Sequence, residues 1–213
     1  MNEAVQQKKH AGIYGYELAY LGVLAVITAF LGWLAENFGC LVFDGRIDSR
    51  YHILPLIPPY ALIPVAAAVI FGDPDRWTFF GRRVFKKDTT ASKILSNLCV
   101  LVICCAVVFI GEFCAGNLYE ILFGEVLWNY SSQPLSFGKY NAIIPTVGYG
   151  GGAWLLMKFV YKPLMDVMRR KLRYKTAVII CAAVLPLMLA DAAAMLIQTA
   201  AAGAPMYWRL DIF

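Results

Sequence analysis

Long apolar stretches alternate with short polar segments along the whole chain. Five stretches contain no Asp, Glu, Lys or Arg: 18–35, 53–71, 94–111, 140–157 and 176–190. A bilayer core about 30 Å thick needs roughly 20 helical residues per crossing, so each stretch with its flanks is long enough for one crossing. The pattern predicts an all-α polytopic membrane protein, a single membrane domain over 1–213, with helices at about 16–36, 53–71, 94–116, 140–160 and 176–200.

The basic residues lie mainly on one side of this predicted arrangement. When the connecting segments are assigned alternately to two sides, the N-terminal tail and the segments 72–93 and 158–175 hold 15 of the 19 Lys and Arg residues. Short loops rich in Lys and Arg remain in the cytoplasm. We therefore predict a multi-pass protein of the cell (inner or plasma) membrane, with a cytoplasmic N-terminus and the C-terminus outside.

Composition excludes a soluble globular class and explains the positive charge. Sixty per cent of the residues are hydrophobic, and the formal net charge is +5. Because the positive charge lies on short loops beside anionic headgroups, we expect the lipid bilayer and no nucleic acid as a partner. Most of the six cysteines lie in apolar stretches, where a thiol packs as a small hydrophobe. No C-x-x-C spacing occurs, so we expect neither a metal site nor another cofactor.

The second and third stretches depart from simple helices. Prolines at 55, 58, 59 and 64 prevent a regular helix start, which leaves a kinked entry packed against neighbours or a loop lining a cavity. The third pattern runs from 94 to 123, interrupted only by Glu112 and Glu120. A straight helix of that length measures about 45 Å, so it must tilt, break near Gly111 or Gly116, or turn along the outer surface.

Three acidic residues share one depth near the outer edge of the hydrocarbon. Glu36, Glu112 and Asp191 each lie 16 to 19 residues from an inner boundary, or about 24–28 Å along a helix. Placing an ionisable group at membrane depth costs free energy, so such a group is a candidate functional residue. Either these acids form interfacial ion pairs with loop residues such as Arg50, or they line an outward-facing polar pocket for a cation, a metal or a lipid headgroup.

Weaker patterns concern packing and the cytoplasmic segments. Residues 30–37 resemble residues 109–117, which suggests a parallel duplication, and Gly148-x-x-x-Gly152 has a helix-packing spacing. Segment 72–93 mixes aromatic and basic residues, a composition that suits a segment lying on the lipid headgroups of the inner leaflet. Segment 158–175 predicts an amphipathic surface helix or the inner end of a crossing. Either segment could instead dock a soluble partner.

Four motifs carry a family resemblance over about residues 30–165. They are G-W-x-x-E at 32–36, P-x-x-P-x-Y at 55–60, E-F-x-x-G at 112–116 and W-N-Y-S-x-x-P at 128–134. The chain resembles the bacterial membrane-protein family labelled "putative ABC-transporter permease" (type IV, CmpB-like). The resemblance implies a transport role. It also highlights Asn129, where the family pattern has Asp, and Tyr51-His52 and Leu54, where glycines are usual.

The motifs and the resemblance together define the predicted function. We predict a permease-like or transport-accessory subunit of a bacterial membrane complex, working as a homo-oligomer. No G-x-x-x-x-G-K-[ST] motif occurs, so an ATPase would be a separate chain docked on 72–93 and 158–175. The alternatives are a membrane-embedded enzyme acting on a lipid or lipid-linked substrate, with Glu36 or Glu112 as general base and Arg50 holding a phosphate, and a non-catalytic scaffold.

No residue is assigned a catalytic role. The candidate substrate-binding residues are Glu36, Arg50, Glu112, Trp128, Asn129, Tyr130 and Asp191, and the residues expected to support them are Trp33, Tyr60, Gly116, Glu120 and Ser131.

Overall fold

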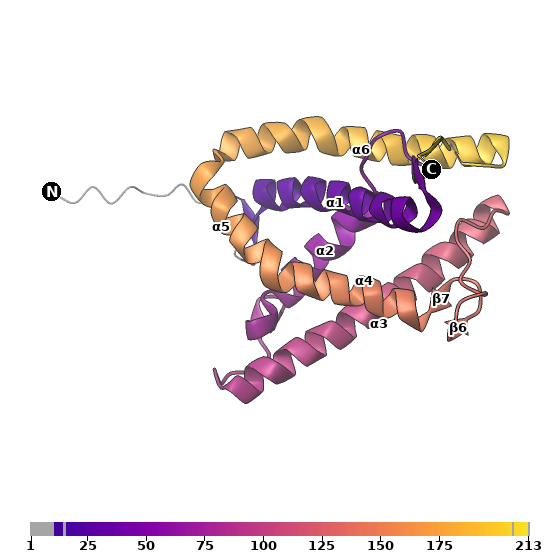
Figure 1. The fold of residues 1–213 in the computed structure, drawn as a ribbon. Helices are drawn as coiled ribbons and strands as arrows, with labels where there is room; N and C mark the ends of the chain where they lie inside the picture. Colours follow the sequence, from indigo (N-terminus) through magenta and orange to yellow (C-terminus); the bar gives the residue numbers. More distant parts are fainter. Residues whose placement is uncertain (1–10, 15, 206, 213) are drawn as a thin grey trace.

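The computed structural model describes residues 11–14, 16–205 and 207–212, and it is mostly helical (Figure 1). Three helices are long and apolar enough to cross a membrane: α1 (Leu18–Asp44), α3 (Thr90–Phe123) and α6 (Tyr174–Ala202). The helices α2 (Pro58–Phe71) and α4 (Ile143–Leu156) have 14 residues each. At about 1.5 Å per residue they measure roughly 21 Å, less than the hydrocarbon thickness. The structure therefore supports a helical membrane protein with three helices of spanning length in its described part.

Short antiparallel ribbons occupy the connecting segments. They pair β1 (Gly12–Ile13) with β2 (Tyr16–Glu17), β3 (Arg46–Asp48) with β8 (Arg209–Asp211), β4 (Thr78–Phe79) with β5 (Arg82–Arg83), and β6 (Ser136–Phe137) with β7 (Asn141–Ala142). The β3–β8 ribbon brings the end of the chain beside the loop that follows α1. This end, with the β6–β7 ribbon, is called the acidic end below, and the end with β4, β5 and α5 is called the basic end (Figure 1).

Helix α3 is continuous over its 34 residues. The Thr89 side chain caps its start by accepting a hydrogen bond from the Ser92 N–H, and Gly124 ends it in the left-handed conformation. Neither Gly111 nor Gly116 interrupts the helix. At 34 residues α3 is about 51 Å long, which exceeds the thickness of the hydrocarbon core. Of the three arrangements expected for so long a helix, the structure favours a tilt, since α3 runs at an angle to α1 and α6 (Figure 1).

The proline-rich entry to α2 is packed rather than open. The helix begins at Pro58, five residues after the predicted start, and places Pro58 and Pro59 where a helix leaves N–H groups unpaired. Leu56 and Ile57 are buried, and the Ile57 N–H donates to the Ala29 carbonyl oxygen of α1 at 3.3 Å. The entry is therefore the kinked, packed arrangement, and the prediction of a helix from residue 53 is wrong.

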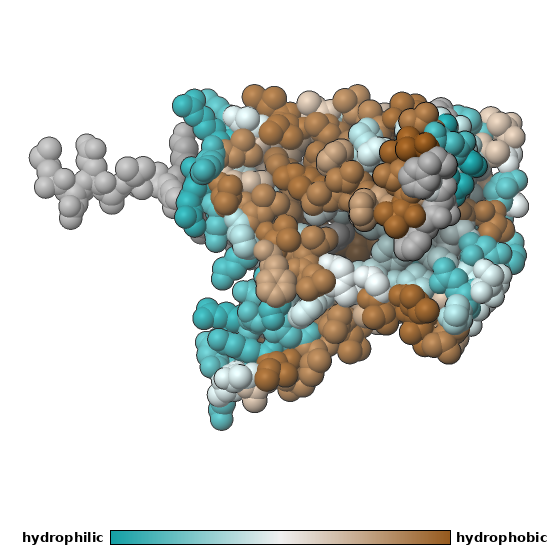
Figure 2. Space-filling view, in the orientation of Figure 1, coloured by the Kyte–Doolittle hydropathy of each residue, from teal (hydrophilic) through white to brown (hydrophobic). Residues whose placement is uncertain are grey.

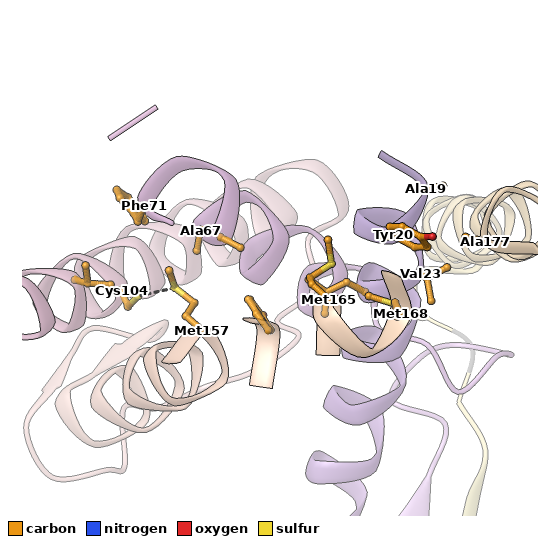
Figure 3. Packing of buried hydrophobic residues seen from close by; sticks show 14 residues of the cluster. Ala19, Tyr20, Val23, Ala67, Phe71, Cys104, Met157, Met165, Met168 and Ala177 are labelled. Atoms are coloured by element: carbon orange, nitrogen blue, oxygen red, sulfur yellow. Dashed lines mark hydrogen bonds between the residues drawn. The ribbon is translucent and has the colours of Figure 1, made fainter. Parts of the chain in front are cut away.

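Helix α4 continues towards the basic end through a π-helical turn, Met157–Tyr161, into α5 (Lys162–Lys171). Met165 and Met168 of α5 are buried in the main core beside Tyr20 of α1 and Ala177 of α6 (Figure 3). The cations at the end of α5 remain exposed. Segment 158–175 is thus the packed continuation of α4, not a helix lying alone on the surface.

The long helices form two groups separated by a hollow. Helix α1 packs against α2 and α6, and α3 packs against α4. The groups meet at the basic end through the short helix Pro74–Arg76 and the π-helical turn. Near the acidic end, the Tyr119 hydroxyl donates to Thr199 Oγ1 at 2.9 Å. Figure 2 shows an apolar band between two hydrophilic ends, with a hollow in the band between α1 and α4.

Candidate functional site

Glu36 of α1 is held by Arg50 from the loop after β3. Arg50 Nη2 lies 2.6 Å from Glu36 Oε2, and Arg50 Nε donates to the same oxygen at 2.7 Å. Asp48 positions the arginine, because its side chain accepts the Arg50 N–H at 2.9 Å. The Asp48 N–H donates in turn to Asn37 Oδ1 at 2.8 Å. Burial opposes the charge on Arg50, but Glu36 and Asp48 more than offset it, so the pKa of Arg50 is raised.

Tyr60 of α2 completes the surroundings of Glu36. Its hydroxyl donates to Glu36 Oε1 at 2.6 Å. Gly32 lies one turn before Glu36, and a Cβ added there would run into the Tyr60 ring. The glycine therefore allows the close approach of α1 and α2 that brings the tyrosine to the carboxylate.

The same arrangement occurs a second time between α3 and the segment before α4. Lys139 Nζ lies 2.6 Å from Glu120 Oε1, and the Tyr140 hydroxyl donates to Glu120 Oε2 at 2.5 Å. A Cβ added at Gly116 would run into the Tyr140 ring. Trp128 belongs to this cluster, because its Nε1–H donates to the Tyr140 carbonyl oxygen at 3.3 Å and the two rings meet edge-on at 5.8 Å.

The two arrangements relate the two halves of the predicted duplication residue by residue. In each, a glycine is followed four residues later by a glutamate, and a tyrosine and a cation from the next segment bind that glutamate. The geometry matches Gly32 with Gly116 and Glu36 with Glu120.

Glu112 of α3 is bound differently from these two glutamates. The Tyr130 hydroxyl donates to Glu112 Oε1 at 3.2 Å, whereas Oε2 is buried without a hydrogen-bond partner in the described part of the chain. Tyr149 of α4 interacts electrostatically with both Glu112 and Glu36. Its ring also contacts that of Tyr60, with ring centroids 6.3 Å apart. Tyrosine side chains therefore connect the two acids across the helix groups.

Tyr149 is a site residue that the sequence did not reveal. It lies inside the run V-G-Y-G-G-G, which predicted only helix packing. That packing is made by Gly150, where a Cβ would meet Cys105 of α3, while Gly148 and Gly152 have no atom within 4 Å of an added Cβ. A tyrosine between glycines is only a weak signal of a polar site. The neighbouring glycines show merely that the ring has space around it.

Asp191 has a structural position apart from the other acids. It is 6% exposed, and its carboxylate accepts the N–H groups of Ile53 at 2.9 Å and Leu54 at 3.1 Å. His52 Nδ1 lies 3.4 Å away. Burial lowers the pKa of His52 and Asp191 only partly offsets this, so the ring is neutral near pH 7. Asp191 thus anchors the proline-rich entry to α2. Although Asp191 and Glu112 have similar predicted depths, they bind different partners.

The remaining predicted residues shape the loop and helix surfaces. Asn129 Oδ1 accepts the Ser131 N–H at 2.9 Å, the local turn that Asn and Asp both favour. The family's Asp could accept the same bond, so Asn129 preserves the turn while removing a charge from an exposed position. Trp33 stacks on Phe30, with centroids 6.3 Å apart. In the described residues, no group of three His, Cys, Asp or Glu is placed to hold a metal ion.

A family model described as "Putative ABC-transporter type IV" matches residues 23–196. The chain belongs to this family. The matched range contains every predicted site residue and all of the long helices except their ends. No curated protein and no solved structure shows significant similarity to the chain. Membership supports a membrane protein with a transport-related role.

Proposed function

We propose that the chain is a permease-like or transport-accessory subunit of a multi-pass complex in the bacterial cell membrane. The observation that carries this proposal is the polar row Glu36, Tyr60, Tyr149, Tyr130 and Glu112, which lies between two helix groups of an otherwise apolar band. Polar groups at such depth are costly. A row of them between helix groups suits the binding of a polar solute or headgroup within the membrane.

Five crossings with the N-terminus inside remain our proposed topology. Helices α4 and α5 with the turn between them form 29 consecutive helical residues, from Ile143 to Lys171, which is enough for a crossing. Helix α2 is extended by the packed entry before it. A reporter active only outside the cytoplasm should work when fused after Phe213 and be silent when inserted beside Lys87. The reverse pattern would contradict the orientation.

A separate ATPase subunit is the partner that the family suggests, and the basic end is its proposed docking surface. Lys86 and Lys87 are exposed there, and Phe79 and Phe80 are 50% and 45% exposed beside them. Charged rim residues set the rate and salt dependence of association. This surface offers both the charge and the apolar contacts that a docked subunit needs.

Purification from native membrane in mild detergent tests the transport role. We expect the tagged chain to bring down an ATPase, and Lys86→Glu with Lys87→Glu to lower its recovery severalfold at unchanged membrane abundance. Arg209→Glu at the acidic end is the matched control and should leave recovery unchanged. If wild-type chain brings down no ATPase or sister permease, the scaffold alternative replaces the transport role.

The enzyme alternative finds less support in the geometry. Arg50 is engaged by Glu36, Asp48 and Cys40, so it is not free to hold a phosphate, and Glu36 is neutralised. Homo-oligomer formation stays part of the proposal. Gly148 and Gly152 on α4 have no neighbour at an added Cβ, and small residues at this spacing allow close helix approach.

A further inference from the structure

Glu112 differs from the other acids near the edge of the apolar band in having one carboxylate oxygen without a hydrogen-bond donor among the described residues. Glu36 pairs with Arg50, Glu120 pairs with Lys139, and Asp191 accepts two backbone N–H groups. Within the described part of the chain, Glu112 has one hydrogen bond, from Tyr130, and no cation within ion-pair distance. No cation among the described residues therefore neutralises Glu112.

The second oxygen of Glu112 lacks a donor. Oε2 has less than 1 Å² of exposed surface and no hydrogen-bond partner among the described residues. A buried carboxylate oxygen without a donor is costly, because it has lost water and gained nothing in return. A donor from outside the chain would remove that cost.

The surroundings of Glu112 indicate which donor fits. Tyr130 bonds the carboxylate, and Tyr149 lies within electrostatic range of it while its side chain stays 40% exposed. Aromatic ring faces attract cations, above all alkylated ammonium groups. An anion would be repelled by the carboxylate. A divalent metal needs several carboxylate, imidazole or thiolate ligands, which the described residues do not assemble here.

We infer that Glu112, with the rings of Tyr130 and Tyr149, binds an organic ammonium group. The ammonium N–H groups or methyl groups would face Glu112 Oε2, and the tyrosine rings would surround the charge. An ammonium group of this kind can belong to a phospholipid headgroup or to a soluble amine. This inference rests on the proposed function and names the ligand class of the same site.

The test compares ammonium probes with inorganic salts on the purified full-length chain. Ethylammonium and tetramethylammonium chloride should raise the thermal unfolding midpoint above that in equimolar NaCl or KCl, since a ligand bound only by the folded state stabilises it. Glu112→Gln keeps the shape and the acceptor for Tyr130 but removes the charge. Its apparent affinity for the probes should be at least about tenfold weaker, whereas Glu125→Gln in the exposed loop should match wild type.

A second arm identifies the source of the ammonium group. In nanodiscs, phosphatidylethanolamine replacing phosphatidylglycerol should stabilise wild type more than Glu112→Gln if the headgroup is the ligand. Soluble probes alone should do so if the ligand is a free amine. Equal effects of sodium and ammonium, or equal effects in wild type and Glu112→Gln, would overturn the inference. ATPase recovery is read separately, so loss of ammonium binding with intact recovery rejects the ligand class and leaves the transport role standing.

Discussion

Replacing Arg50 with Met should destabilise the folded protein by about 3 kcal/mol, because it removes the cation that pairs with Glu36 and the nearer of the two cations beside Asp48. Arg50 bonds Glu36 and also lies 3.4 Å from Asp48 Oδ2. The side chain of Asp48 is 2% exposed and that of Glu36 is 21% exposed, so solvent screens neither charge well. Thermal unfolding in detergent and membrane abundance measure the loss.

Two further variants separate this effect from the general loss of a surface arginine. Arg209→Met removes an exposed cation that pairs with Asp211 in its own strand, and such pairs contribute at most about 1 kcal/mol. Adding Glu36→Gln to Arg50→Met should recover part of the stability, because it removes one uncompensated charge. If Arg209→Met is as damaging as Arg50→Met, the pairing with Glu36 is not what holds the loop.

The sequence predicted the membrane class and the long helices, and it named Arg50 as a possible ion-pair partner of the acids without saying which acid it would bind. Uncharged runs of helical length identify α1, α3 and α6 directly. Arg50 could be proposed because it is one of few cations on the acidic side. Tyr60 was reached through the family motif, since nothing local shows which helix its hydroxyl will meet.

Residue counting could not say which acids share a site. The rise per residue gives depth along a helix, but the direction of a side chain around the helix axis depends on which neighbours pack there. Glu112 and Glu120 lie eight residues apart on one helix, or about 80° apart around its axis, and they have different partners. Asp191 has the predicted depth but faces the entry to α2. Tyr149 could not be found this way, because its role depends on a contact with Tyr60 about 90 residues away.

Gly32→Ala and Gly116→Ala should each destabilise the protein by about 1–3 kcal/mol, the usual range for adding a methyl group to a filled space. At both positions the new Cβ would meet a tyrosine ring, Tyr60 or Tyr140. The ring must move, and its hydroxyl then loses the hydrogen bond to Glu36 or Glu120. Unfolding midpoints of the single variants would show the loss.

Glycines on the same two helices provide matched controls for these substitutions. Gly39 of α1 and Gly111 of α3 have nothing within 4 Å of an added Cβ. Alanine is a better helix former than glycine by about 1 kcal/mol, so Gly39→Ala and Gly111→Ala should be neutral or stabilising. The sign of the effect should therefore differ between positions on one helix, which a general intolerance of substitution would not produce. If all four variants lose stability alike, tyrosine packing is not the reason for Gly32 and Gly116, and the two glutamate clusters lose their shared structural basis.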